Sequence, residues 1–168
     1  MARKVFYCFH YDGDKDRVAQ VRNMGVVEGS PIASDNDWEQ IKRGGDPAIK
    51  RWIDSQMNGT SCCVVLIGKA IANRKWVNYE IDEAWKQGKG VVGVHIYGLK
   101  DLKSQQSSKG ANPMDYVNAT INGATRPISS LAKAYDPPFT DSKAVYKHIS
   151  DNLPSWIEEA IRIRNGSK

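Results

Sequence analysis

The stretch CCVVLIGKAIANRKWVNYEI, residues 62–81, indicates the fold of this chain, because an unbroken apolar run is followed at once by a helical pattern. Residues 62–68 are rich in β-branched side chains and end in glycine, which is typical of a strand buried on both faces. From Asn73 the apolar residues recur at helical spacing, and Gly88 ends the pattern. A buried strand that leads directly into a helix is the repeating unit of a parallel α/β sheet.

The same unit recurs along the chain. Residues 4–9 (KVFYCF) and 91–97 (VVGVHIY) are further apolar runs, and a helix is expected after the first of them. Weaker signals predict a short second strand in the loop from Asn23 to Asn36 and another strand near residues 132–135. We therefore predict a flavodoxin-like, three-layer α/β/α fold with a parallel sheet of about five strands, in a single domain of residues 1–168.

Three more helical segments are expected. Residues 37–40 suggest one isolated turn, and Asp46-Pro47 suggests an N-cap followed by proline at the first helical position. The buried stripe of that second helix would contain Ile49, Trp52, Ile53 and Met57. A closing helix is predicted over residues 142–164, with a break near Pro154.

Residues 99–125 are polar and rich in glycine, serine and asparagine. A connection of this length is usually a functional lid or a family-specific insertion, so we expect it to cover a site.

The composition is that of an ordinary globular protein, with 26% charged and 40% hydrophobic residues among 168. No apolar stretch reaches 18 residues and no signal peptide is evident, so we expect a cytoplasmic protein that does not interact with membranes. Cys8, Cys62 and Cys63 are expected to be small buried hydrophobes, because adjacent cysteines in a strand point to opposite faces. The net charge of +5 favours anionic partners, but the lysines and arginines are scattered, which argues against nucleic acid.

One carboxylate of the 73–88 helix has an unusual position. With a rotation of about 100° per residue, Glu80 lies roughly 70° from the centre of the apolar stripe, whereas Asp82 and Glu83 lie well away from it. Glu80 would then sit between core and cleft, where burial raises its pKa and a nearby cation lowers it. The competing interpretation is a surface glutamate paired with Arg74 or Lys75.

Open α/β sheets bind ligands at the carboxyl ends of their strands. Phe9, His10 and Tyr11 end the first strand, close to the start of the Glu80 helix. His10 could orient a phosphate or a ribose hydroxyl, and Trp38 and Trp76 could stack on a flat ring. The competing interpretations are a strand-end histidine and ordinary aromatic packing.

Several standard sites are absent from the sequence. Glycine-rich dinucleotide and phosphate loops, a nucleophile elbow and zinc-ligand spacings do not occur, so no metal is expected. Asp12 and Asp14 resemble the acidic pocket of a receiver domain. However, Gly68-Lys69 stands where such a domain needs its phosphoacceptor aspartate.

Taken together, an ordered set of segments resembles the bacterial TIR-like family that includes the Thoeris antiphage proteins. These segments are VFYCFHY (5–11), VRN (21–23), DWE (37–39), VLIG (65–68), NRKWVNYEI (73–81) and SKGANPMDY (108–116).

The resemblance implies a TIR fold and, in catalytic members, cleavage of NAD between nicotinamide and ribose. The family's catalytic glutamate lies in a Trp-x-x-x-Glu pattern, which here is residues 76–80 and maps onto Glu80. The candidate substrate-binding residues are Phe9, His10, Tyr11, Asn23, Trp38 and Trp76. One departure is Cys8, near a position where many TIR domains have serine.

The resemblance also implies that NAD is a substrate and that no further cofactor is needed. In the Thoeris members, infection is thought to trigger formation of a cyclic ADP-ribose isomer that activates a partner effector. Self-association through TIR surfaces and a phage-derived trigger are expected as well. The alternatives are a non-catalytic TIR interaction module and a nucleoside glycosyltransferase of related fold.

Overall fold

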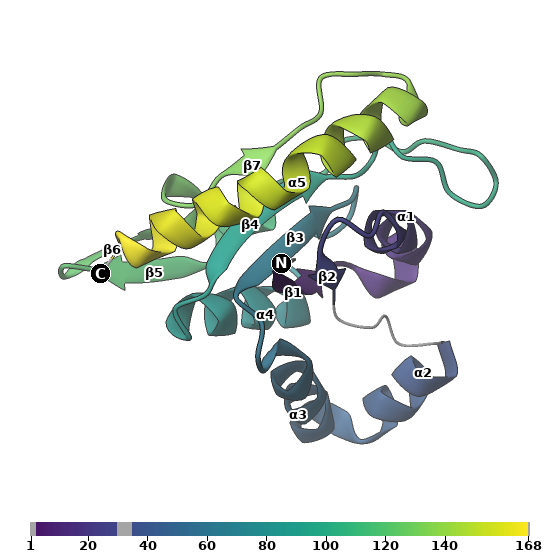
Figure 1. Ribbon diagram of the computed structural model, residues 1–168. Coiled ribbons are helices and arrows are strands. Elements are labelled where there is room, and N and C mark those ends of the chain that lie inside the picture. Colours follow the sequence, from purple (N-terminus) through teal and green to yellow (C-terminus); the bar gives the residue numbers. More distant parts are fainter. Residues whose placement is uncertain (1–2, 30–34, 168) are drawn as a thin grey trace.

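A five-stranded parallel sheet forms the centre of the computed structural model, which describes residues 3–29 and 35–167. The strands lie in the order β2-β1-β3-β4-β7, which is the flavodoxin-like order, and each neighbouring pair is parallel (Figure 1). Their bounds are β1 (Lys4–Cys8), β2 (Glu28–Gly29), β3 (Cys62–Ile67), β4 (Gly90–His95) and β7 (Ala134–Tyr135). The predicted fold class is confirmed, including both short strands. Residues 30–34 of the loop expected between Asn23 and Asn36 lie outside the described residues.

Strand β3 is buried along its whole length, because helices cover both faces of the sheet. Its alternate residues belong to two separate cores: Cys63 packs on the side of α3 and α4, and Cys62 on the side of α1 and α5. The adjacent cysteines therefore point to opposite faces, as predicted, and both are free and buried, as is Cys8.

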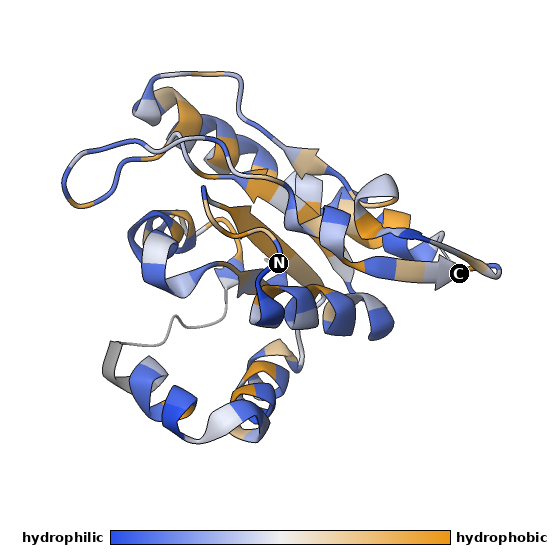
Figure 2. Cartoon of the chain, turned by 180° about the vertical axis from the view of Figure 1, so that it is seen from behind, coloured by the Kyte–Doolittle hydropathy of each residue, from blue (hydrophilic) through white to orange (hydrophobic). Residues whose placement is uncertain are grey.

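The helices form the two outer layers. Helices α1 (Tyr11–Asn23) and α5 (Ser142–Asn165) cover one face, α3 (Gly45–Met57) and α4 (Lys75–Lys86) cover the other, and α2 (Asp35–Arg43) packs on α3. Figure 2 shows hydrophobic residues concentrated on the central strands, between helices whose surfaces are mainly hydrophilic. Among the described residues, no helix has the length and apolar character needed to cross a bilayer.

Some predicted helix boundaries were wrong. Helix α5 continues through Pro154 without a break. Pro154 is exposed on the outer side of the helix, and the buried neighbours Leu153 and Trp156 hold this part of the helix on the core. Asp46 is not an N-cap: α3 begins at Gly45, and the Asp46 carboxylate instead pairs with Lys75. The expected single turn at residues 37–40 is the nine-residue helix α2.

The segment 99–125 has two parts. Its second part folds as the 3₁₀ helix η1 (Pro113–Tyr116) and the antiparallel strands β5 (Asn118–Ile121) and β6 (Ala124–Pro127), followed by η2 (Ile128–Ser130). The side chain of Met114 is fully buried in the core beside α4.

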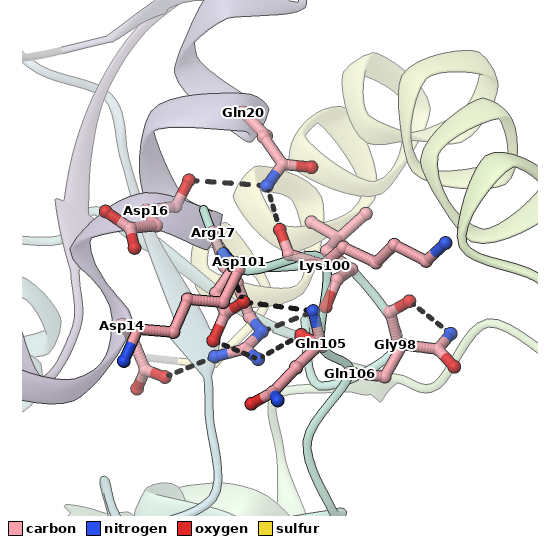
Figure 3. Close-up of polar contacts among 11 residues, drawn as sticks. Asp14, Asp16, Arg17, Gln20, Gly98, Lys100, Asp101, Gln105 and Gln106 are labelled. Carbon is pink, nitrogen blue, oxygen red and sulfur yellow. Dashed lines mark hydrogen bonds and ion pairs between the residues drawn. The ribbon is translucent and has the colours of Figure 1, made fainter.

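The first part, a loop, is fastened to α1 (Figure 3). Arg17 donates hydrogen bonds to the carbonyls of Leu99 and Gln105, each at 2.9 Å, and Gln20 donates to the carbonyl of Lys100. These bonds hold residues 99–105 beside α1, and Gly110 lies against the backbone of Gly68 at the end of β3. None of residues 99–125 lines the cavity at the end of β1.

Candidate active site

A cavity of about 270 Å³ opens at the carboxyl end of β1. The end of β1, the first turns of α1 and α4, and side chains from α2 and α3 form its walls. The lining residues are Phe6, Tyr7, Phe9, His10, Tyr11, Asp12, Trp38, Lys42, Trp52, Gln56, Arg74, Lys75, Trp76, Val77 and Glu80. This is the sheet edge where parallel α/β folds bind ligands, at the switch point between β1 and β3.

Glu80 lies on the inner side of this cavity. It follows Trp76 by one helical turn on α4, and only 8% of its surface is exposed. No cation among the described residues forms an ion pair with it, and the nearby Lys75 pairs with Asp46. The interpretation of Glu80 as a surface residue paired with Arg74 or Lys75 is therefore wrong.

The burial of Glu80 changes its acidity. Removal from water raises the pKa of this carboxyl group to about 8, and a hydrogen bond from the Cys8 thiol lowers the pKa by a smaller amount. Cys8 is itself fully buried on β1, with its Sγ 3.9 Å from the carbonyl oxygen of Val77. Near neutral pH, Glu80 is therefore mostly protonated, and a cationic ligand would favour its ionised form.

Aromatic rings form one wall of the cavity. Ring centroids are 6.1 Å apart for Phe9 and Tyr11, 5.4 Å for Tyr11 and Trp38, and 5.8 Å for Trp38 and Trp52. These spacings are typical of packed aromatic pairs, which hold flat surfaces in place for a ring-shaped ligand. Trp76, from α4, lines the cavity as well and packs edge-on against Tyr79 at 5.7 Å.

Three cations also line the cavity. Lys42 pairs with Glu39 at 2.8 Å, and Lys75 pairs with Asp46 at 2.5 Å. The third, Arg74, precedes α4 and donates from Nε to the carbonyl of Ala70 at 2.9 Å. An anionic part of a ligand would find favourable charge at these positions.

The structure brings together six of the seven predicted site residues. Glu80 shares one cavity with Phe9, His10, Tyr11, Trp38 and Trp76. The seventh, Asn23, is exposed at the last position of α1 and does not line the cavity. Helix α1 begins beside the cavity at Tyr11 and carries the chain about 18 Å away over twelve residues, so the geometry does not support Asn23 as a binding residue.

Several lining residues are not among the predicted site residues. Trp52, expected in the buried stripe of α3, is half-buried and reaches the cavity, and Lys42, Gln56 and Arg74 line it as well. The contact between Cys8 and Glu80 joins β1 to α4. The alternation of β1 does place Cys8 on the same face as Phe6, toward α4, which is the one signal that could have indicated it.

The sheet order and the cavity at its β1–β3 switch point define a flavodoxin-like α/β domain with a candidate ligand site at the usual sheet edge. A family described as "Thoeris protein ThsB, TIR-like domain" matches residues 6–101, which include every residue that lines the cavity. That match covers more than half of the chain, so the chain belongs to this family of TIR-like Thoeris proteins.

A relative from Bacillus cereus (strain MSX-D12) carries the name "Putative cyclic ADP-D-ribose synthase ThsB1". It is 41% identical over 122 residues, which cover 70% of this chain and 64% of the relative. The chain therefore spans just under two thirds of the length of this curated relative.

Proposed function

We propose that this TIR-like domain cleaves NAD between nicotinamide and ribose and closes the remaining ADP-ribose into a cyclic isomer. The observation that carries the proposal is a buried glutamate that has no cationic partner in the part of the chain that the structure describes, set in a cavity with aromatic walls. The name of the Bacillus cereus relative states cyclic ADP-D-ribose synthesis for that protein and supports the same reaction here.

The reaction suits a single carboxylate. Nicotinamide in NAD is already cationic, so it leaves as a neutral molecule when the C1′–N bond breaks and the electron pair passes to nitrogen. Positive charge then develops on the ribose, and an ionised Glu80 stabilises that charge at close range in a site of low dielectric constant. No general acid is needed to assist the leaving group.

The second step decides the product. Water adding to C1′ and losing a proton gives linear ADP-ribose, whereas a ring nitrogen or hydroxyl of the same molecule gives a cyclic isomer. The lining is dominated by aromatic and aliphatic side chains, Phe6, Phe9, Trp38, Trp52 and Val77 among them. A cavity of this kind disfavours water near the ribose and supports cyclisation over hydrolysis.

In a Thoeris system, the cyclic product would act as a signal that activates an effector after infection by phage. Self-association through TIR surfaces, an effector that recognises the product and a phage-derived trigger are part of this proposal. NAD is the substrate, and no additional cofactor is invoked.

The test is to incubate the protein with NAD in ¹⁸O-labelled water and to identify the products by mass spectrometry. The proposal predicts nicotinamide together with an equal amount of a cyclic product that carries no ¹⁸O. Linear ADP-ribose labelled with ¹⁸O would show that the protein is a hydrolase and not a cyclase. No nicotinamide from protein activated by phage infection would favour a non-catalytic interaction module.

A further inference from the structure

The size of the cavity limits which part of a dinucleotide it can hold. Pockets that enclose a whole drug-sized ligand measure about 300–1,000 Å³, and this cavity measures about 270 Å³. If the proposed function is right, the nicotinamide and its ribose fill the cavity beside Glu80. The two phosphates must then lie at or beyond its mouth, so the charges there determine how the substrate is held.

Arg74 differs from the other two cations of the lining. Lys42 and Lys75 each have a carboxylate partner, whereas Arg74 has none among the described residues. Its hydrogen bond from Nε to the carbonyl of Ala70 fixes one edge of the guanidinium group. Neither terminal nitrogen has a hydrogen-bond partner among the described residues, and a planar pair of donors matches two phosphate oxygens.

The position of Arg74 along α4 also fits. Arg74 precedes Glu80 by six residues, which is a rise of about 9 Å along the helix axis. A ribose 5′-phosphate is shorter than this from C1′ to phosphorus, so the extended Glu80 and Arg74 side chains must span the remaining distance. An anomeric carbon held beside Glu80 would therefore place the attached phosphate near the first turn of α4.

Two features of the surroundings support an anion at this point. Helix α4 has twelve residues, and the Arg74 side chain does not cap its N-terminus, so the first backbone N–H groups remain available beside the cavity. Lys75, whose Nζ lies 4.9 Å from the Trp76 ring centroid, adds part of its positive charge on the same turn, because Asp46 pairs with it.

We propose that Arg74 forms a phosphate-binding subsite at the mouth of the cavity and selects nicotinamide substrates that carry a 5′-phosphate or pyrophosphate. Arg74 binds the substrate in this proposal and takes no part in bond cleavage. The identity of the ligand in this subsite rests on the proposed function. The affinity of the subsite for phosphate can be measured independently of NAD cleavage.

The test compares wild type with Arg74→Ala and Arg74→Lys on three substrates: NAD, nicotinamide mononucleotide and nicotinamide riboside. Loss of a bidentate, charge-assisted contact should raise the KM for both phosphorylated substrates about tenfold or more in Arg74→Ala. The KM for the riboside, which carries no phosphate, should change less than about twofold. Arg74→Lys, which keeps the charge but loses the planar donor pair, should fall between wild type and Arg74→Ala.

The matched control is Lys86→Ala, which removes a cation at the other end of α4 that pairs with Asp82 at 2.8 Å. It should leave all three KM values unchanged. An equal KM increase for NAD and riboside in Arg74→Ala would overturn the subsite, as would no increase for either.

A binding measurement separates failure of the subsite from failure of the proposed reaction. If wild type releases nicotinamide from none of the three substrates, calorimetry with ADP and with adenosine still tests Arg74. Tighter binding of ADP than of adenosine, with the difference lost in Arg74→Ala, would support the subsite without NAD cleavage. Equal binding of ADP by wild type and Arg74→Ala would exclude it.

Discussion

Glu80 and Asp14 are two buried carboxyl groups close to strand ends, and they differ in their surroundings. Asp14 is 5% exposed and Glu80 is 8% exposed, and burial raises the pKa of both groups. Asp14 lies 4.0 Å from the guanidinium group of Arg17 (Figure 3), which lowers the pKa of Asp14 again. Asp14 does not line the cavity. Glu80 has a cavity in front of it and a thiol, not a cation, beside it.

This comparison shows that burial alone does not identify a reactive carboxylate. The carboxyl group of Asp14 packs against Gly68, with its Oδ2 only 2.0 Å from where a Cβ at Gly68 would lie, so this contact requires glycine at residue 68. Arg17, which pairs with Asp14, also donates hydrogen bonds to two carbonyls of the loop after β4 and so holds this loop in place. We infer that Asp14 serves the structure and Glu80 serves the chemistry.

The largest expected effect is on turnover. Glu80→Gln should lower kcat/KM for nicotinamide release by about a thousandfold, because a neutral amide cannot stabilise developing positive charge. Asp14→Asn should change it less than about threefold in the same assay. Glu83→Gln, on the same helix, is the control for a general effect on α4. A loss in Asp14→Asn as large as that in Glu80→Gln would remove the distinction between the two groups.

The next effect is on stability. Arg17→Ala should reduce the free energy of unfolding by about 4 kcal/mol, because it leaves Asp14 buried without a cation and two loop carbonyls without their donor. Urea denaturation measures this change. Lys147→Ala, which breaks an exposed ion pair with Asp151, should leave the midpoint almost unchanged. Equal stability of Arg17→Ala and wild type would show that the cluster does not hold the loop.

The third effect is a pH-dependent loss of stability caused by the burial of Glu80. The unfolded carboxyl group loses its proton near its ordinary pKa of 4.5, and the folded one keeps it until about pH 8, so folding becomes less favourable as pH rises through this window. Glu80→Gln has no such penalty. Its stability relative to wild type should therefore increase by about 3 kcal/mol between pH 5 and pH 8. A constant difference across this range would mean that Glu80 titrates normally.

The smallest expected effect concerns Cys8. Its thiol lowers the pKa of Glu80, so Cys8→Ala should raise that pKa further. The midpoint of the pH profile of kcat/KM should then move to higher pH by less than about one unit, and Cys8→Ser, a better donor, should move it to lower pH. An unchanged midpoint in both variants would show that the thiol has no influence on the carboxyl group.

The sequence predicted the elements that depend on local patterns. The apolar run of residues 62–67 and the helical pattern after it predicted the central strand and the helix that follows it. The helical rotation of about 100° per residue was enough to place Glu80 at the edge of the core. The aromatic wall depends on how α2 and α3 pack together, so Trp52 was assigned to the core. Local spacing could not reveal this arrangement, because it involves residues that are distant in the chain.

Two other predictions differ from the geometry for physical reasons of the same kind. The length and polarity of residues 99–125 suggested a lid, but these properties do not show that Arg17 and Gln20 hold the loop on the α1 side. Asn23 belongs to a segment that resembles the family, but the length of α1 separates it from the cavity. In both cases the position depends on elements outside the segment itself.

The most direct test of the account is the pH dependence of kcat/KM for nicotinamide release by the wild-type protein. Because kcat/KM reports ionisation in the free enzyme, it should rise with pH and level off above an apparent pKa of about 8, as the Glu80 carboxyl group ionises. A rate that is independent of pH across this range, or that falls as Glu80 ionises, would contradict the claim that a buried, unpaired carboxylate at this position breaks the bond.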